Sequence, residues 1–243
     1  MKILVLDIET SPHHGIFWSL YDKPYSPDKI DSQGFMLSYS AKWVGERGYF
    51  TKRYDSGSEF FDTLHELMNK ADAIITYNGD KFDLTHINRE FLAHGYPPVR
   101  PCASIDLYKF VKTTFYLPSY RLDYVAQYFL GDNKAETGGL QLWRDVENGD
   151  ERAWSKFLRY NKKDVTLTEE LYLLFRPWMR NHPYVGPVDE SVFRDSEEDY
   201  GRCPVCQSPR LTLQRPRRTR CFAIRLVRCG DCGHYFDGKR KKL

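Results

Sequence analysis

Short apolar runs and helical periodicity alternate along the first part of the chain. A continuous apolar run at residues 1–6 suits a buried strand, and residues 36–44 and 48–54 suit two more. Residues 59–68 carry apolar side chains at helical spacing, and residues 71–77 return to a short apolar run. The pattern therefore predicts a sheet that begins at the N-terminus and continues after a helix.

The same alternation continues toward the middle of the chain. Residues 84–94 have helical spacing that stops at Gly95, and residues 103–106 suit another strand. A helix at residues 122–130 should stop at Gly131, since glycine adopts the left-handed backbone that often ends a helix. The order of elements predicts an α/β domain.

The longest periodic segment is residues 150–179, in which apolar side chains from Trp154 to Trp178 mark the face we expect to be buried. From residue 177 to 201 the chain collects Pro, Gly and acidic side chains without periodicity, which predicts a linker. Two short strands are expected beyond it, at residues 210–214 and 222–228. We therefore divide the chain into a domain of residues 1–178, a linker of residues 179–200 and a small module of residues 201–243.

Charge is divided between these units more sharply than the overall net charge of +3 suggests. Residues 201–243 hold 12 Lys and Arg against 2 Asp and Glu, whereas residues 1–200 hold 24 against 31. A basic module favours a phosphate-rich partner, although surface Lys and Arg are often only a solvated face.

The apolar start ends at Asp7, too early for a signal peptide, and no stretch approaches the ~20 apolar residues of a membrane span. We expect a cytoplasmic protein, in the host cytoplasm if the source is viral, with no membrane partner.

The first candidate site is the tripeptide Asp7-Ile8-Glu9. Carboxylates at i and i+2 of a strand leave the same face of a sheet. The same Asp-x-Glu spacing recurs at residues 145–147 and 195–197, where it suits an exposed acidic pair. Only the first copy ends an apolar strand, where unpaired charge would be costly without a cation.

A second candidate site lies at residues 77–83, where a strand ends and a helix begins. Loops after strands often carry catalytic groups, and Asp83 is the acidic residue next to the helix. Alternatively, Asp83 is only the N-cap of that helix.

A third site is Tyr160 with Asp164, which share one face of the long helix at i, i+4 spacing. An aspartate on the face of this helix that we expect to be buried again requires a compensating cation.

Taken in this order, the three sites resemble the Exo I, Exo II and Exo III motifs of the DEDD exonuclease superfamily, in its tyrosine-bearing branch. The stretches at residues 78–83 and 120–131 are especially similar to the proofreading domains of family-B DNA polymerases. The resemblance covers about residues 1–178. It implies a ribonuclease H-like fold, in which helices flank a mixed sheet of about five strands whose first three are antiparallel.

The resemblance also implies a set of ligands and roles. Asp7, Glu9, Asp83 and Asp164 would hold two Mg²⁺ or Mn²⁺ ions, since hard carboxylate oxygens select hard cations. One ion, on Asp7, Glu9 and Asp164, would activate a water, and the other, on Asp7 and Asp83, would stabilise the leaving 3′ oxygen. Tyr160 would orient that water. Thr10 and Asn78 could contact the terminal nucleotide, and Phe82 could stack on a base or, as we favour, belong to the core.

Two cysteine pairs lie in the basic module. Cys203-x-x-Cys206 and Cys229-x-x-Cys232 are separated by 22 residues, close to the spacing of four-cysteine zinc sites. The alternatives are two disulfides, disfavoured in a reducing compartment, or four unrelated thiols. The module resembles a zinc ribbon with one structural Zn²⁺. Cys221, expected on a ribbon strand, and His234, expected to pack on aromatic rings, are left out of the ligand set.

The leading functional hypothesis is a 3′-5′ exonuclease that acts on single-stranded DNA, with a role in DNA replication or repair. An RNA 3′ exonuclease and a structure-directed nuclease on the same fold are alternatives, because fold does not settle substrate. A hypothesis of another class is a non-catalytic DNA-binding adaptor that uses the ribbon. Nucleic acid is the expected partner, and a separate polymerase or replication protein is a second candidate.

Overall fold

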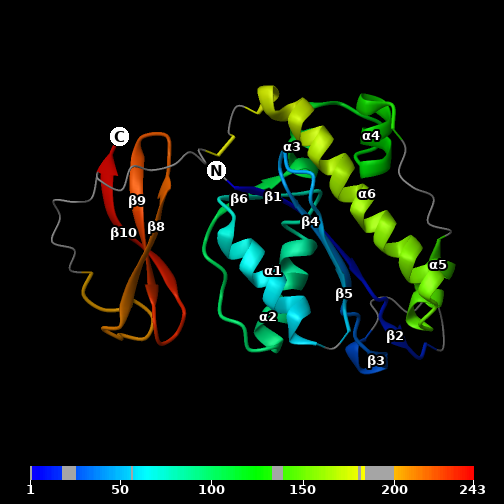
Figure 1. The fold of residues 1–243 in the computed structure, drawn as a ribbon, viewed down its shortest axis with the longest axis horizontal. Coiled ribbons are helices and arrows are strands. Elements are labelled where there is room, and N and C mark those ends of the chain that lie inside the picture. Colours follow the sequence, from blue (N-terminus) through cyan, green and yellow to red (C-terminus); the bar gives the residue numbers. More distant parts are fainter. Residues whose placement is uncertain (1, 18–25, 56, 133–138, 180–181, 184–199) are drawn as a thin grey trace.

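The structure, a computed structural model, describes residues 2–17, 26–55, 57–132, 139–179, 182–183 and 200–243. Residues up to 179 carry a five-stranded sheet flanked by helices, and residues 201–243 carry a separate three-stranded sheet (Figure 1). We call these the sheet domain and the ribbon. Most of the expected linker, residues 184–199, lies outside the described residues, so the domain boundaries remain a prediction. No helix in the described part of the chain is both long and apolar enough to cross a bilayer.

The five-stranded sheet has the strand order β5-β4-β1-β6-β7. Its strands are β1 (Ile3–Thr10), β4 (Met36–Trp43), β5 (Phe50–Arg53), β6 (Ala73–Thr76) and β7 (Ala103–Asp106). β1, β4 and β5 are antiparallel neighbours, and β6 and β7 run parallel to β1. The expected mixed sheet whose first three main strands are antiparallel is confirmed.

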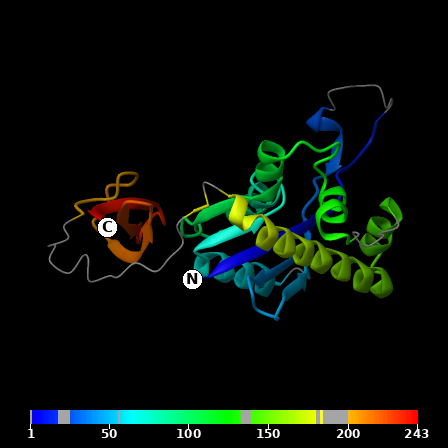
Figure 2. The same ribbon diagram turned by 90° about the horizontal axis from the view of Figure 1, so that it is seen from above.

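Helices cover both faces of this sheet (Figure 2). They are α1 (Ser58–Lys70), α2 (Asp83–Ala93), α3 (Leu107–Thr114), α4 (Leu122–Leu130), α5 (Leu140–Glu147) and α6 (Glu151–Phe175). Because side chains alternate along a strand, Leu4, Leu6 and Ile8 pack with α1 and α2 on one face. Ile3 and Val5 pack with α3, α4 and α6 on the other. Asp7 and Glu9 continue the row of Ile3 and Val5, so they face α6.

The long helix buries the expected stripe. Its buried positions include Phe157, Asn161, Asp164 and Thr168, which recur at helical spacing and face the sheet. The helix ends at Phe175 and is followed by the 3₁₀ turn η2 (Arg176–Trp178). The prediction that Trp178 is buried is therefore wrong: its side chain is 64% exposed, because the chain leaves the helical path before it.

Some elements had no clear signal in the pattern. α3 and α5 have only eight residues each, too few for a sustained apolar stripe. A small hairpin of β2 (His14–Gly15) and β3 (Ile30–Ser32), with the 3₁₀ turn η1 (Pro27–Lys29) before β3, extends beyond the end of β1. The last strand of the ribbon, β10 (Tyr235–Lys242), is an edge strand rich in Lys and Arg, as edge strands often are. Its charged sequence hides the alternation that marks a strand.

The ribbon consists of β8 (Leu211–Arg218), β9 (Phe222–Cys229) and β10 (Tyr235–Lys242), with β9 in the centre. Its buried apolar side chains are few, and most lie on β9: Ala223, Ile224, Leu226 and Val227. Cys221 lies exposed in the turn between β8 and β9, so its expected place on a strand is wrong. The ribbon contacts the sheet domain through an ion pair between Arg215 and Asp72.

Candidate functional site

Three carboxylates converge at the end of β1. Oxygen atoms of Asp7, Glu9 and Asp164 all lie within 4.8 Å of one another. Asp7 and Glu9 reach this point because they share the face of β1 that is covered by α6, and Asp164 lies on the buried stripe of that helix. Serines of β4 stand opposite them, Ser40 beside Asp7 and Ser38 beside Glu9, and these small side chains leave room above the sheet. The arrangement is a cluster of hard oxygen donors.

Asp83 lies outside this cluster of three carboxylates, but a hydrogen bond holds it against the same strand. β6 pairs with β1 only as far as Val5. The backbone N–H of Ile8, which lies further along β1, therefore has no partner in β6. The Asp83 carboxylate accepts this N–H at 3.0 Å, which holds it beside Asp7 and Glu9. The N-cap interpretation is wrong, because Asp83 is the first residue of α2 and Phe82 occupies the cap position.

The environment of Asp83 is also unfavourable for a lone negative charge. Its side chain is buried, and burial raises its pKa to about 7 although it accepts backbone N–H groups. A divalent cation nearby would favour the charged form and lower this pKa again. The carboxylate is therefore suited to a metal site.

The loop between β6 and α2 is held by a tight backbone turn. Asn78 has a positive φ of 67°, which asparagine tolerates better than most residues. A Cβ on Gly79 would lie 2.4 Å from the side chain of Thr76, so only glycine fits there. Asp106 accepts the N–H of Asn78 at 3.0 Å and also caps α3. Asp106 was not predicted from the sequence, although an aspartate between a strand and a helix is a recognisable cap signal.

A second residue missed from the sequence is Asn161. Its side-chain amide donates to the carboxylate of Asp7 at 2.6 Å, and it accepts a hydrogen bond from Ser38 at 3.4 Å. Asn161 is fully buried on α6, one turn before Asp164. Its signal was a polar side chain at a position of the buried stripe of α6. The contact fixes the rotamer of Asp7 and ties α6 to β1.

Tyr160 lies half-buried on α6 beside a further residue that was missed. The ring of Trp143 on α5 packs edge-on against Tyr160, with centroids 6.3 Å apart. The indole N–H of Trp143 donates to the backbone oxygen of Thr10 at 3.1 Å. Thr10 and Tyr160 are therefore neighbours of one indole ring, and Thr10 follows directly after Glu9. No pattern marked Trp143, since α5 is short.

Phe82 is not a core residue. Its side chain is 40% exposed and packs at an angle on the ring of His86, with centroids 4.6 Å apart. Phe82 is the residue before Asp83, at the N-cap of α2, and its ring is partly open to solvent. The interpretation of Phe82 as core is wrong, because the chain turns into α2 at this residue.

The four predicted cysteines of the ribbon form one cluster. The Sγ atoms of Cys203 and Cys232 are 3.7 Å apart, and those of Cys206 and Cys229 are 3.5 Å apart. Sulfurs held tetrahedrally at a Zn–S distance of about 2.3 Å would be about 3.8 Å apart. These separations fit a zinc ion and exclude disulfides.

Backbone amides favour the thiolate form of two of these cysteines, Cys203 and Cys229. The N–H of Val205 donates to Cys203 and that of Asp231 to Cys229, both at 3.4 Å. A backbone hydrogen bond from Cys232 lowers the pKa of Cys229 to about 7. His234 stays outside the cluster and stacks on Phe236, as expected.

Comparison with known proteins places these features in a family. The sequence profile of the RNase H superfamily matches residues 35–175, which include Asp83, Tyr160 and Asp164. The DNA polymerase of Thermococcus litoralis is 25% identical over 221 residues, which cover 73% of this chain and 12% of that protein. DNA polymerase 1 of Saccharolobus solfataricus is 31% identical over 144 residues, covering 50% of this chain and 15% of that protein.

A solved structure has a similar fold. The family B DNA polymerase from Pyrobaculum calidifontis superimposes with a TM-score of 0.54 at 20% sequence identity, over 73% of this chain and 25% of the polymerase. The chain thus spans at most a quarter of the length of these three polymerases. Since the profile match covers more than half of the chain and the sheet is the expected mixed sheet of five strands, this protein belongs to the RNase H superfamily.

Proposed function

We propose that this protein is a 3′-5′ exonuclease that hydrolyses single-stranded DNA with two divalent cations. The observation that carries the proposal is the convergence of Asp7, Glu9 and Asp164 at the end of β1, with Asp83 hydrogen-bonded to the same strand. Phosphodiester hydrolysis requires charge stabilisation on both the attacking and the departing oxygen. The similarity to DNA polymerases supports DNA as the substrate.

Each residue of the site has a proposed task. Bound Mg²⁺ or Mn²⁺ would supply the positive charge at the scissile phosphate. Asp7, Glu9 and Asp164 would hold one ion, and Asp83 would join Asp7 at the other. Asn161 keeps the Asp7 carboxylate in place. Thr10, Asn78 and Phe82 are proposed to contact the terminal nucleotide.

The proposed function is tested by digestion of end-labelled single-stranded DNA and RNA of one sequence. We expect stepwise loss of nucleotides from the 3′ end of DNA with Mg²⁺ or Mn²⁺. Preferential loss from RNA would favour the RNA exonuclease instead. If neither strand nor a branched duplex is cleaved, the result would favour the non-catalytic DNA-binding adaptor. A chelator control alone is insufficient, because it also removes structural zinc.

Replacing Tyr160 with Phe should lower the single-turnover rate by about 10² to 10⁴-fold, because the phenol positions the attacking water. A neutral phenol is a poor general base but a good hydrogen-bond donor. Packing of the ring on Trp143 should survive the substitution. Tyr128→Phe, on a half-exposed ring of α4, is the matched control. An unchanged single-turnover rate in Tyr160→Phe would remove the tyrosine from the mechanism.

We also propose that the ribbon contributes affinity for nucleic acid. Its arginines stand on or beside β8 and β9: Arg215, Arg217, Arg218, Arg220, Arg225 and Arg228. Residues 1–200 carry more acidic than basic side chains, so the sheet domain should bind a phosphate backbone weakly by itself.

Truncation at about residue 195 should therefore weaken binding to single-stranded DNA and flatten its salt dependence. Each lost phosphate contact lowers the slope of log affinity against log salt by about 0.7. The measurement compares full-length and truncated chains on one oligonucleotide at several salt concentrations. Equal slopes would mean that the ribbon binds a protein, such as a separate polymerase, rather than DNA.

A further inference from the structure

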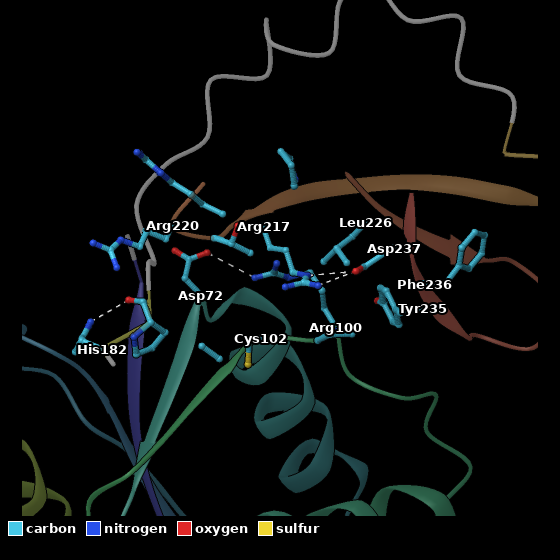
Figure 3. A pocket seen from close by; sticks show the side chains of 16 residues that line it. Asp72, Arg100, Cys102, His182, Arg217, Arg220, Leu226, Tyr235, Phe236 and Asp237 are labelled. Atoms are coloured by element: carbon cyan, nitrogen blue, oxygen red, sulfur yellow. Dashed lines mark hydrogen bonds and ion pairs between the residues drawn. The ribbon is translucent and has the colours of Figure 1, made fainter. Parts of the chain in front are cut away.

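A pocket of about 710 Å³ lies between the sheet domain and the ribbon (Figure 3). We call it the interdomain pocket. The sheet domain contributes Asp72, Arg100 and Cys102 from the start of β6 and β7, and the ribbon contributes side chains of β8, β9 and β10. Its volume lies within the range of small-molecule sites, which is about 300 to 1,000 Å³.

The lining of this pocket carries more cations than anions. It includes Arg100 from the sheet domain and Arg217, Arg218 and Arg220 from the ribbon, against Asp72 and Asp237. Both acidic groups are already engaged. Asp72 pairs with Arg100 and Arg215 and accepts the backbone N–H of Lys2, and Asp237 pairs with Arg217 at 2.7 Å.

Arg218 and Arg220 supply the excess charge. Within the described ranges, neither side chain forms an ion pair with another residue. Arg100 differs from them, because its side chain is only 8% exposed and donates to the backbone oxygens of Asn69 and Ala71. Burial, and then the neighbouring Arg215, lower the pKa of Arg100, and a bound anion would oppose both effects.

The pocket lies at the opposite end of the sheet from the carboxylates. Asp72 is bonded to the backbone of Lys2, at the start of β1, whereas Glu9 lies at its end. At about 3.3 Å per residue, the distance between Lys2 and Glu9 along the strand is roughly 23 Å. A stacked single strand, at about 3.4 Å per nucleotide, would need roughly seven nucleotides to cover that distance. A ligand here is therefore not the nucleotide undergoing cleavage.

We propose that the interdomain pocket binds a nucleotide through its phosphate, held between Arg218 and Arg220 of the ribbon and the buried Arg100 of the sheet domain. Guanidinium groups suit this ligand because they form paired hydrogen bonds with phosphate oxygens. Tyr235 also lines the pocket, and aromatic rings are common stacking partners for bases. The nucleotide comes either from an internal position of the bound strand or from free mononucleotide. The choice of ligand rests on the proposed nuclease function.

The test uses the full-length Asp7→Asn chain without chelator, so that cleavage does not intervene and zinc stays bound. Binding of a labelled 15-nucleotide DNA strand is measured at several salt concentrations. Arg218→Ala with Arg220→Ala should weaken binding about tenfold or more and lower the salt slope by about 0.7 to 1.4. Arg218→Lys with Arg220→Lys keeps both charges and should retain most of the slope.

Arg210→Ala with Lys242→Ala is the matched control. It removes two ribbon cations that do not line the pocket, and Arg210 is already paired with Asp231. This control should bind DNA almost as tightly as the Asp7→Asn chain without further substitutions. Zinc content and circular dichroism verify that each variant is folded. Equal losses in the pocket variant and the control would overturn the proposal, since only general charge would matter.

A second arm identifies the source of the nucleotide. Deoxyadenosine 5′-monophosphate is added as a competitor to the 15-nucleotide strand. If the mononucleotide displaces the strand from the Asp7→Asn chain but not from the same chain with Arg218→Ala and Arg220→Ala, the pocket accepts free mononucleotide. An absence of competition, with the slope still reduced in that variant, would assign the pocket to an internal nucleotide of the strand. Since no arm depends on cleavage, failure of the exonuclease proposal would leave these results unchanged.

Discussion

Replacing Asp7 with Asn should lower the rate of phosphodiester cleavage by at least about 10³-fold, or about 4 kcal/mol of activation free energy. Asp7 is the carboxylate proposed to serve both cations, and the substitution withdraws its charge. Asn is nearly isosteric, so affinity for DNA measured without cleavage should stay close to that of the parent chain. The measurement is the single-turnover rate on end-labelled single-stranded DNA at saturating Mg²⁺.

The structure also predicts the effect of Asp7→Asn on stability. Asp7, Glu9 and Asp164 crowd three carboxylates within 4.8 Å, so removing one negative charge should not lower the Tm without metal. Added Mg²⁺ should raise the Tm of the parent chain more than that of the variant. Asp145→Asn is a matched control, because Asp145 belongs to another Asp-x-Glu pair but lies on α5 and bonds to Gln141. Parent-like cleavage by Asp7→Asn would overturn the assigned site.

Replacing Cys229 with Ser should abolish zinc binding and unfold the ribbon. Cys229 is fully buried within the four-cysteine cluster, and structural zinc contributes about 10 to 16 kcal/mol in comparable small modules. The ribbon buries few apolar side chains, so it has little other support. We expect one zinc per parent chain by atomic emission, much less in the variant, and rapid proteolysis after about residue 200.

Cys221→Ser is the control for this experiment. Cys221 is exposed in the turn between β8 and β9 and lies outside the cluster, so its replacement should keep the zinc content and the protease resistance. The sheet domain of Cys229→Ser should keep its own core and its four carboxylates. A Cys229→Ser chain with full zinc content and a protected ribbon would contradict the proposed ligand set.

Local periodicity in the sequence was sufficient to predict much of the fold. The period of two along β1 places Asp7 and Glu9 on one face, and helical spacing places Asp164 on the buried stripe of α6. The strand β7 and the helix α4 have the predicted bounds, because an apolar run and a glycine stop are local signals. The cysteine spacing likewise predicted the cluster in the ribbon.

Other features depend on residues that are distant in the chain, and only the tertiary structure decided them. Asp83 accepts the N–H of Ile8 because the pairing of β6 with β1 ends at Val5. No local pattern in β1 predicts where the pairing with its neighbour ends. Asn161 reaches Asp7 across 154 positions, and Trp143 meets Thr10 across 133. The interdomain pocket needs the ribbon to lie against the start of β6. Periodicity determines which face of an element a side chain occupies, whereas the partner on that face is set by how the elements pack together.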